Sequence, residues 1–359
     1  MTRNSHRQII VGLSGGLDSA VALLLLKEQG YQPIGLTLRY SGWSTKENIY
    51  SNQESIHLAK KVCRQLKAPH YTLDCRQEFK KKVIGYFISL LKNKKTPNPC
   101  IVCNQQLKFE KLISFAKQKG IEYVATGHYA RIRKIKDEYQ LLRGKDKQKD
   151  QSYFLCLLDQ KQLAKIVFPL GDLTKKKVYR IAEKKGLDFL IRKKQSQDLC
   201  FVIQKSMPLF LKKEIGLHPG QIVDKKDKIL GQHQGLHFYT IGQRKGIKLA
   251  GGPWWVIGFN KKKNQLIVTN IENDPALFSR TVILSDGHFV SGKLPQKIIK
   301  VKAKTRFNQA PASAKLYILP KKNSRLVFDR PQKAVTPGQW TVFYQNQVCL
   351  GGGIIDSVL

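Results

Sequence analysis

The N-terminal part of the chain alternates short apolar runs with a longer helical pattern. Residues 9–11 form a β-branched run that ends at Gly12, and residues 19–30 follow an apolar helix pattern closed by a glycine. Residues 33–38 supply the next strand pattern. A strand, a glycine turn, a helix and a second strand make a βαβ unit, whose parallel strands need a helix covering the sheet.

The same alternation continues along the chain to about residue 126. Residues 70–73 and 122–126 have strand patterns, and three stretches have helix patterns, namely 48–66, 77–92 and 104–119. The pattern therefore predicts an α/β fold with a doubly wound parallel sheet. Residues 131–143 resemble a charged hairpin, and residues 173–186 a further helix.

The pattern changes near residue 218 to short β-rich runs separated by glycine, lysine or proline turns. This change predicts a small β-containing domain followed by a β-barrel. The expected boundaries are an N-terminal α/β domain at 1–210, a central domain at 211–278 and a C-terminal β-barrel at 279–359. A length of 359 residues exceeds the usual size of a single core, which agrees with several domains.

A glycine-rich turn lies directly between the first strand and the first helix. It comprises Gly12, Leu13, Ser14, Gly15, Gly16, Leu17, Asp18 and Ser19. Its backbone N–H groups and the positive end of the helix can cradle an anion, and Ser14 and Ser19 add hydroxyl donors. Asp18 can hold or orient a magnesium ion, because hard cations favour carboxylate oxygen. The plainer alternative is an ordinary glycine-rich β–α turn.

The net charge and the number of cysteines indicate which kind of partner and which cellular compartment to expect. Lysine and arginine total 64 against 25 acidic residues, a formal charge of +39 that favours a polyanionic partner such as nucleic acid. A lysine-rich proteome would produce the same bias, and short clusters such as residues 175–177 are expected to be solvated faces. Without a membrane-length apolar run or a secretory leader, a cytoplasmic protein with seven thiols is expected.

Two cysteines lie in polar, motif-like surroundings. Cys103 ends a stretch, residues 94–103, whose prolines predict an extended loop, and it precedes a helix expected from Asn104, whose positive end would lower its pKa. Cys200 lies where a polar approach at 193–199 meets an apolar strand. Cys100 makes a Cys-x-x-Cys pair with Cys103, which also admits a redox pair, half a zinc site or iron–sulfur ligands.

The remaining cysteines are expected to be small buried apolar residues without a chemical role. They are Cys63, Cys75, Cys156 and Cys349.

The Ser-Gly-Gly-x-Asp-Ser pattern resembles the pyrophosphate-loop family, which cleaves ATP to AMP and pyrophosphate. Over essentially its whole length the chain looks like the tRNA-specific 2-thiouridylases. The matching motifs lie at 12–19 (GLSGGLDS), 96–104 (TPNPCIVCN), 125–131 (ATGHYAR), 149–155 (KDQSYFL), 168–171 (FPLG), 196–201 (SQDLCF) and 242–246 (GQRKG).

The resemblance implies a tRNA uridine 2-sulfurtransferase. ATP would adenylate the 2-oxygen of the wobble uridine, position 34, in tRNAs for Lys, Glu and Gln. Cys200 would carry sulfur as a persulfide received from a donor protein, and Cys103 would be its catalytic partner, with a transient Cys103–Cys200 disulfide as by-product. Leu38 and Gly127 would line the adenosine pocket beside the loop, and Asn98, Pro99 and Cys100 would border the target base.

The resemblance also assigns a set of tRNA contacts. They are His128, Lys149, Asp150, Gln151, Arg306, Phe307 and Gln339. Taken alone, His128 is more typical of a hydrogen-bonded structural histidine, and Gln339 of an ordinary turn residue after Pro337 and Gly338.

One departure from the family pattern leaves alternatives open. Some relatives carry aspartate where this chain has Cys100. Cys100, Cys103 and Cys200 would suffice to hold a four-iron cluster with one open iron, which could bind the transferred sulfur in place of a persulfide. The loop and charge alone also fit an ATP-dependent ligase acting on a small metabolite, or an RNA-binding protein without activity.

Overall fold

The computed structural model describes every residue except 1–6, 46–47, 193–198 and 203–206. For residues 41–45 and 48–51 it describes the backbone only. Its N-terminal part is built on five parallel strands in the order β5-β2-β1-β6-β9. The strands are β1 (Gln8–Gly12), β2 (Gln32–Arg39), β5 (His70–Asp74), β6 (Tyr123–Thr126) and β9 (Ile166–Val167). The predicted parallel sheet is therefore confirmed.

Helices cover both faces of this sheet. Side chains of successive β1 residues point to opposite faces, so their packing partners show which helices lie on each face. Ile9 and Val11 pack in one cluster with helices α1 (Leu17–Glu28) and α2 (Gln53–Gln65). Ile10 packs on the other face with the helices that run from α3 to α6. Residues 48–51, expected to begin a helix, instead form strand β4 (Asn48–Ser51), which pairs with β3 (Ser41–Thr45).

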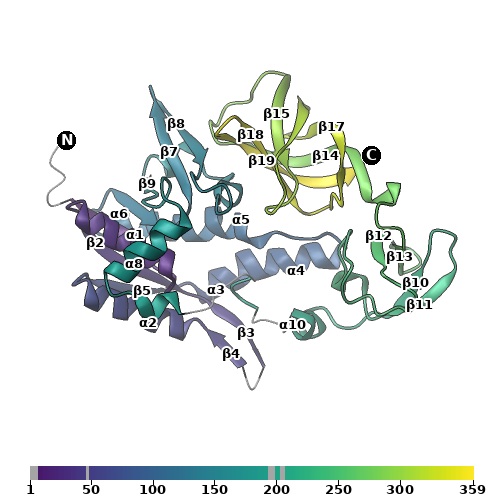
Figure 1. Cartoon of the computed structure of the whole chain (residues 1–359), viewed down its shortest axis with the longest axis horizontal. Coiled ribbons are helices and arrows are strands. Elements are labelled where there is room, and N and C mark those ends of the chain that lie inside the picture. Colours follow the sequence, from purple (N-terminus) through teal and green to yellow (C-terminus); the bar gives the residue numbers. More distant parts are fainter. Residues whose placement is uncertain (1–6, 46–47, 193–198, 203–206) are drawn as a thin grey trace.

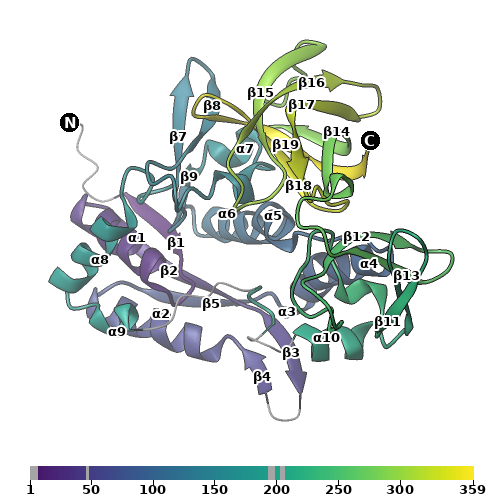
Figure 2. The ribbon, with the colours of Figure 1, turned by 45° about the vertical axis from the view of Figure 1, so that its right-hand side comes forward.

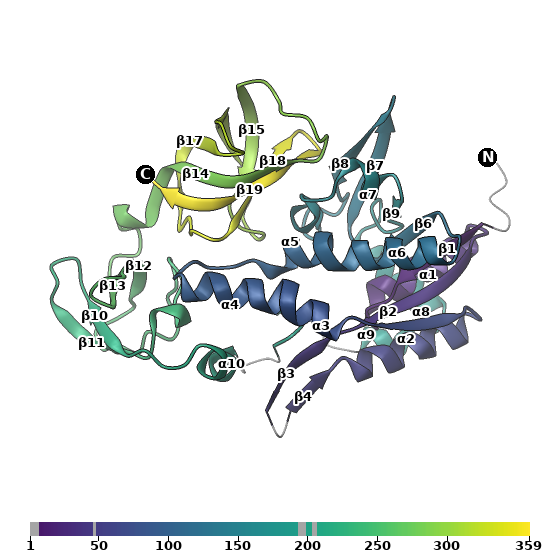
Figure 3. The same ribbon diagram turned by 180° about the vertical axis from the view of Figure 1, so that it is seen from behind.

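Two long helical runs extend from the sheet toward the rest of the molecule (Figure 3). The first joins α3 (Arg76–Phe79), a π-helical segment (Lys80–Ile84) and α4 (Gly85–Lys92). The second joins α5 (Pro99–Cys103), another π-helical segment (Asn104–Phe109) and α6 (Glu110–Gln118).

The predicted extended loop at 94–103 is wrong in its second half, because α5 begins at Pro99. Proline is favoured at the first helical position, where its missing N–H would have no helical partner in any case.

The predicted helix at 173–186 is present as α8 (Lys175–Lys184), which packs against α9 (Asp188–Ile191), while the short helix α7 (Gln160–Leu163) lies beside β8 (Glu138–Arg143). The hairpin expected at 131–143 forms from β7 (Ala130–Ile135) and β8. Short 3-10 turns occur at Ser152–Leu155, Leu236–Phe238 and Pro275–Leu277. Among the helices that the structure describes, none is long and apolar enough to span a bilayer.

The C-terminal part is a closed β-barrel, since β14 pairs with both β17 and β19. Its strands are β14 (Phe278–Phe289), β15 (Ile298–Lys304), β16 (Ala312–Ile318), β17 (Ser324–Lys333), β18 (Trp340–Gln345) and β19 (Val348–Val358). The β7–β8 hairpin joins this sheet through β19, with Cys349 opposite Leu141. The barrel is thus fastened to the N-terminal part by main-chain pairing (Figure 1).

In the chain, α10 (Met207–Glu214) and a four-stranded sheet in the order β11-β10-β13-β12 come between these two parts; in space this sheet lies at the end of the molecule away from the parallel sheet (Figure 2). Its strands are β10 (Gly220–Val223), β11 (Ile229–His233), β12 (Trp255–Asn260) and β13 (Gln265–Thr269). The segment between α4 and α5 runs below the barrel in two opposite views (Figures 1 and 3), and it carries Asn98, the first of the predicted target-base residues.

Candidate active site

The phosphate loop lies at the carboxyl edge of the parallel sheet, where open α/β folds bind their ligands. The backbone N–H of Ser14 donates to Ser19 Oγ at 3.2 Å, and Ser19 Oγ donates to the Gly16 carbonyl at 3.0 Å. Gly15 has φ +70°, and a Cβ there would lie 2.3 Å from the Ser55 carbonyl oxygen. Only glycine fits this position, and it lets the backbone adopt the tight turn that an anion cradle needs.

Asp18 of the loop has two partners from distant parts of the chain. Its Oδ1 accepts a hydrogen bond from the Tyr129 hydroxyl at 2.8 Å. The same oxygen forms an ion pair with Lys175 Nζ at 2.6 Å. Lys175 is only 8% exposed. The prediction that residues 175–177 are solvated is therefore wrong for Lys175, because the first residue of α8 turns inward to neutralise Asp18.

The two residues expected at the adenosine pocket lie beside this loop. Leu38, near the end of β2, is buried, and its carbonyl accepts from Asn52 Nδ2 at 2.8 Å. Gly127 follows β6, and a Cβ there would lie 2.6 Å from the backbone of Asp18 and Ser19. Gly127 thus allows the chain after β6 to approach the start of α1 closely.

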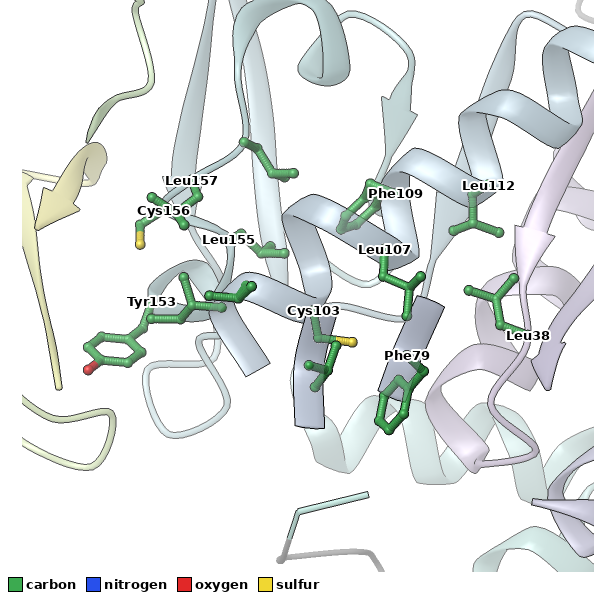
Figure 4. Packing of buried hydrophobic residues seen from close by; sticks show 14 of the residues in the cluster. Leu38, Phe79, Cys103, Leu107, Phe109, Leu112, Tyr153, Leu155, Cys156 and Leu157 are labelled. Carbon is green, nitrogen blue, oxygen red and sulfur yellow. The ribbon is translucent and has the colours of Figure 1, made fainter. Parts of the chain in front are cut away.

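Cys103 is the last residue of α5 and lies in the apolar cluster near Phe79 and Leu107 (Figure 4). Burial raises its pKa to about 11; the charge of Lys108 opposes this shift, and the thiol of Cys100 adds to it. The expected lowering of this pKa by a helix N-terminus is wrong. The helix begins at Pro99, four residues before Cys103, and the effect of its dipole fades beyond the first turn.

Cys200 lies near the other two thiols although it comes from a distant segment. The next residue, Phe201, is buried and packs edge-on against Phe79 and Phe87, with ring centroids 5.9 and 5.4 Å apart. Part of Cys200 is exposed, but protein atoms surround its sulfur and raise its pKa. The thiols of Cys103 and Cys100 raise this pKa further, so the three predicted cysteines lie within electrostatic reach of one another.

Cys63, Cys75, Cys156 and Cys349 are buried, as expected, and all seven cysteines are thiols in this structure.

Within the described part of the chain, no three His, Cys, Asp or Glu side chains are arranged to hold a metal ion. The three cysteines therefore do not form a ready iron–sulfur site here. Asp18 keeps a carboxylate beside the anion cradle, which is the ligand type that Mg²⁺ prefers.

Lys108 and Asn104 were not singled out by sequence reasoning. Asn104 is buried; its amide nitrogen donates to the Phe154 carbonyl at 3.0 Å, and its Oδ1 accepts from Lys108 Nζ at 2.8 Å. The charge of Lys108 acts against the raised pKa of Cys100, Cys103 and Cys200 alike. The only signal in the sequence is the spacing of four residues from Cys100 to Asn104 and from Asn104 to Lys108, which places all three on one helix face.

Most residues expected to contact tRNA make internal contacts in the free protein. The Asp150 carboxylate is buried and binds Arg143 at 2.7 Å and the backbone N–H of Gly144 and Ser152 at 3.1 Å. Gln151 Oε1 accepts from the backbone N–H of Tyr129 at 3.0 Å, while Lys149 is exposed.

His128 bonds Thr126 Oγ1 at 2.7 Å and lies between the rings of Phe109 and Phe168. Burial lowers its pKa well below the usual value, so the ring is neutral.

The three C-terminal candidates lie where the barrel meets the N-terminal part. Arg306 donates to the Ile241 carbonyl at 2.8 Å and to Thr336 Oγ1 at 2.7 Å. Phe307 stacks near Phe154 with ring centroids 4.3 Å apart. Gln339 contacts the segment before α5, which also contains the predicted target-base residue Asn98, and Pro99 and Cys100 open α5 itself.

A parallel sheet with a glycine-rich turn at its carboxyl edge, together with two thiols on α5 and a third from the turn at Cys200, is the arrangement expected of an ATP-using sulfurtransferase of the pyrophosphate-loop class. Three family models match the chain: the tRNA methyl transferase HUP domain at residues 7–204, the tRNA methyl transferase PRC-barrel domain at 209–270 and the aminomethyltransferase beta-barrel domain at 279–355. Full-length relatives identify the chemistry more closely. The chain belongs to the family of tRNA-specific 2-thiouridylases.

The similarity to curated relatives spans nearly the entire chain. The tRNA-specific 2-thiouridylase MnmA 1 of Geobacillus kaustophilus is 40% identical over 357 residues, covering 98% of this chain and 96% of that protein. MnmA of Alkaliphilus oremlandii is 40% identical over 356 residues, covering 98% of both chains. MnmA of Halalkalibacterium halodurans is 38% identical over 359 residues. The chain is therefore a tRNA sulfurtransferase that uses ATP.

Proposed function

We propose that the chain replaces the 2-oxygen of the wobble uridine, position 34, by sulfur in tRNAs for Lys, Glu and Gln. The observation that carries this proposal is that Cys200, from a turn after α9, lies within electrostatic reach of Cys100 and Cys103 of α5, in a chain with full-length thiouridylase relatives. A small-metabolite ligase would need the loop but not the thiols.

In the first step, the uracil 2-oxygen attacks the α-phosphate of ATP and pyrophosphate leaves. The backbone N–H groups of the phosphate loop and the hydroxyls of Ser14 and Ser19 are placed to bind phosphate oxygens. Lys175 supplies positive charge beside them. A Mg²⁺ ion bound near Asp18 would neutralise phosphate charge, and Leu38 and Gly127 would border the adenosine.

In the second step, Cys200 carries a persulfide received from a protein sulfur donor. Its terminal sulfur attacks carbon 2 of the activated uridine, and AMP leaves with the former 2-oxygen. The Cys103 thiolate attacks Sγ of Cys200, and the electrons of the broken S–S bond pass to the transferred sulfur. The products are 2-thiouridine and a Cys103–Cys200 disulfide, which an external thiol must reduce.

The high pKa of Cys103 in the free protein has a consequence for this step. Cys103 is protonated near neutral pH, so its attack on Sγ of Cys200 requires the thiol to lose its proton. Asn98, Pro99 and Cys100 are proposed to border the flipped base, with Lys149, Arg306, Phe307 and His128 on the tRNA side.

The test is pyrophosphate release by the purified protein with ATP, in the presence and absence of unmodified tRNA. Release that depends on a substrate tRNA, and that is absent with tRNAs lacking a uridine at position 34, supports the proposal. Equal release without tRNA, or release stimulated only by a small metabolite, contradicts it.

A further inference from the structure

The segment formed by residues 95–98, here called the base segment, joins α4 to α5 and leads directly to Cys100 and Cys103. It belongs to no helix or strand. Pro97 has no N–H, and neither has Pro99, so the backbone offers few donors with which to hold itself in place. A segment of this kind keeps one conformation only if other parts of the protein bind its carbonyls.

One turn of the barrel supplies these bonds. The Thr96 N–H donates to the Pro337 carbonyl at 2.8 Å, and Gln339 Nε2 donates to the carbonyls of both Thr96 and Pro97 at 3.2 Å. Gly338 lies between them with φ +91°, and a Cβ there would lie 2.8 Å from the Thr96 nitrogen. The turn at 336–339 thus touches the base segment without space for a side chain.

The turn itself is held by the barrel. The Gly338 N–H donates to the Ile355 carbonyl at 2.8 Å, and the Ile355 N–H donates back to the Gln339 carbonyl at 2.8 Å. Arg306 also donates a hydrogen bond to Thr336 Oγ1 in the same turn. Lys95 adds an ion pair with Asp356 of β19 at 2.8 Å. The barrel therefore presents Gln339 in a fixed place, and its amide donors are committed to the base segment.

We propose that Gln339 is a positioning residue, through which the barrel holds the base segment and so sets the placement of Asn98 and of α5 with its two cysteines. This inference rests on the proposed function, because it treats these residues as the place where the uridine reacts. It differs from a direct tRNA contact, for which the Gln339 amide would have to release two carbonyls.

The test compares Gln339→Met, which keeps the side-chain length but removes both donors, with Gln345→Met at the exposed far end of β18 as control. Under single-turnover conditions with saturating tRNA, the thiolation rate of Gln339→Met should fall about tenfold, the loss expected for one to two hydrogen bonds. The Kd for tRNA should change less than twofold. A tenfold weaker Kd with an unchanged rate would overturn the proposal.

A second readout needs no activity. Hydrogen exchange of peptides covering residues 95–103, measured without tRNA or ATP, should become at least tenfold faster in Gln339→Met and unchanged in Gln345→Met. Gly338→Ala should have the same effect, because its Cβ would push against Thr96. Unchanged exchange in both variants would overturn the proposal even if thiolation works, whereas a wild-type protein without thiolation would count against the proposed function alone.

Discussion

At the residue scale, the properties of the site residues depend on partners that lie far away in the sequence. Asp18 and Ser19 could be identified from their motif, because the glycine pattern and the strand–helix context are local. Lys175 could not, since one lysine in a cluster of three turns inward only when α8 packs against α1. Likewise, the pKa of Cys103 depends on where α5 begins and on how deeply it is buried, and neither is a local property.

The Asp18–Lys175 ion pair leads to a prediction about ATP use. Lys175→Met leaves a half-buried carboxylate at the anion cradle without its counter-charge, so pyrophosphate release should fall by about 10- to 100-fold, as for the loss of a charged hydrogen bond. Lys176→Met, one residue along and exposed, is the matched control and should release pyrophosphate normally. Equal rates for both variants would remove Lys175 from the site.

At the scale of elements, the alternation of apolar runs was sufficient to predict the parallel sheet, the β7–β8 hairpin and α8. The start of α5 was missed because proline both ends helices and begins them, and only packing of Ile101 and Val102 into the core decides between these roles. The attachment of β8 to β19 was also beyond prediction, since strand pairing across 200 residues has no local signature.

The central sheet region leads to a prediction about pH. His237 is 3% exposed, and burial, with Lys94 and His218 nearby, lowers its pKa to about 4, against the opposing effect of a backbone hydrogen bond at Gly216. The unfolded chain therefore binds more protons than the folded one between about pH 6.5 and 4. Stability should fall as the pH drops through this window, by up to about 3 kcal/mol from this residue.

Thermal unfolding followed at several pH values checks this prediction. His237→Phe should flatten the acid side of the curve relative to wild type, because a phenyl ring has no proton to gain. The other buried histidines titrate in both proteins, so the difference between the two curves isolates His237. Parallel curves from pH 6.5 down to 4 would show that His237 is not responsible.

At the scale of the whole molecule, three regions meet at the base segment. The barrel holds Thr96 and Pro97, the central part contributes Thr240 to the Thr96 hydroxyl at 3.3 Å, and Lys261 reaches the Asn93 carbonyl at 3.3 Å. The order of α/β, central and barrel parts could be predicted from the change in strand and helix patterns along the sequence. The contacts of the barrel and the central part with the base segment could not, because they depend on how the parts pack together.

The net charge of +39 also acts at this scale. If lysine and arginine side chains bind tRNA phosphates, each contact releases condensed counterions, and affinity should fall by about 10³-fold or more between roughly 50 and 200 mM salt. Filter binding or fluorescence anisotropy with one substrate tRNA measures this dependence. An affinity that stays flat over this range would mean that the surplus charge is not used for tRNA.

The central claim is ATP-dependent sulfur transfer to tRNA through Cys200 and Cys103. Its most direct test is mass-spectrometric nucleoside analysis of unmodified tRNA incubated with ATP, a persulfide donor and either wild type, Cys200→Ser, Cys103→Ser or the buried-thiol control Cys63→Ser. We predict 2-thiouridine with wild type and Cys63→Ser, and at least a 100-fold loss in the other two variants. Undiminished 2-thiouridine in Cys200→Ser or Cys103→Ser, or none in wild type, would contradict the claim.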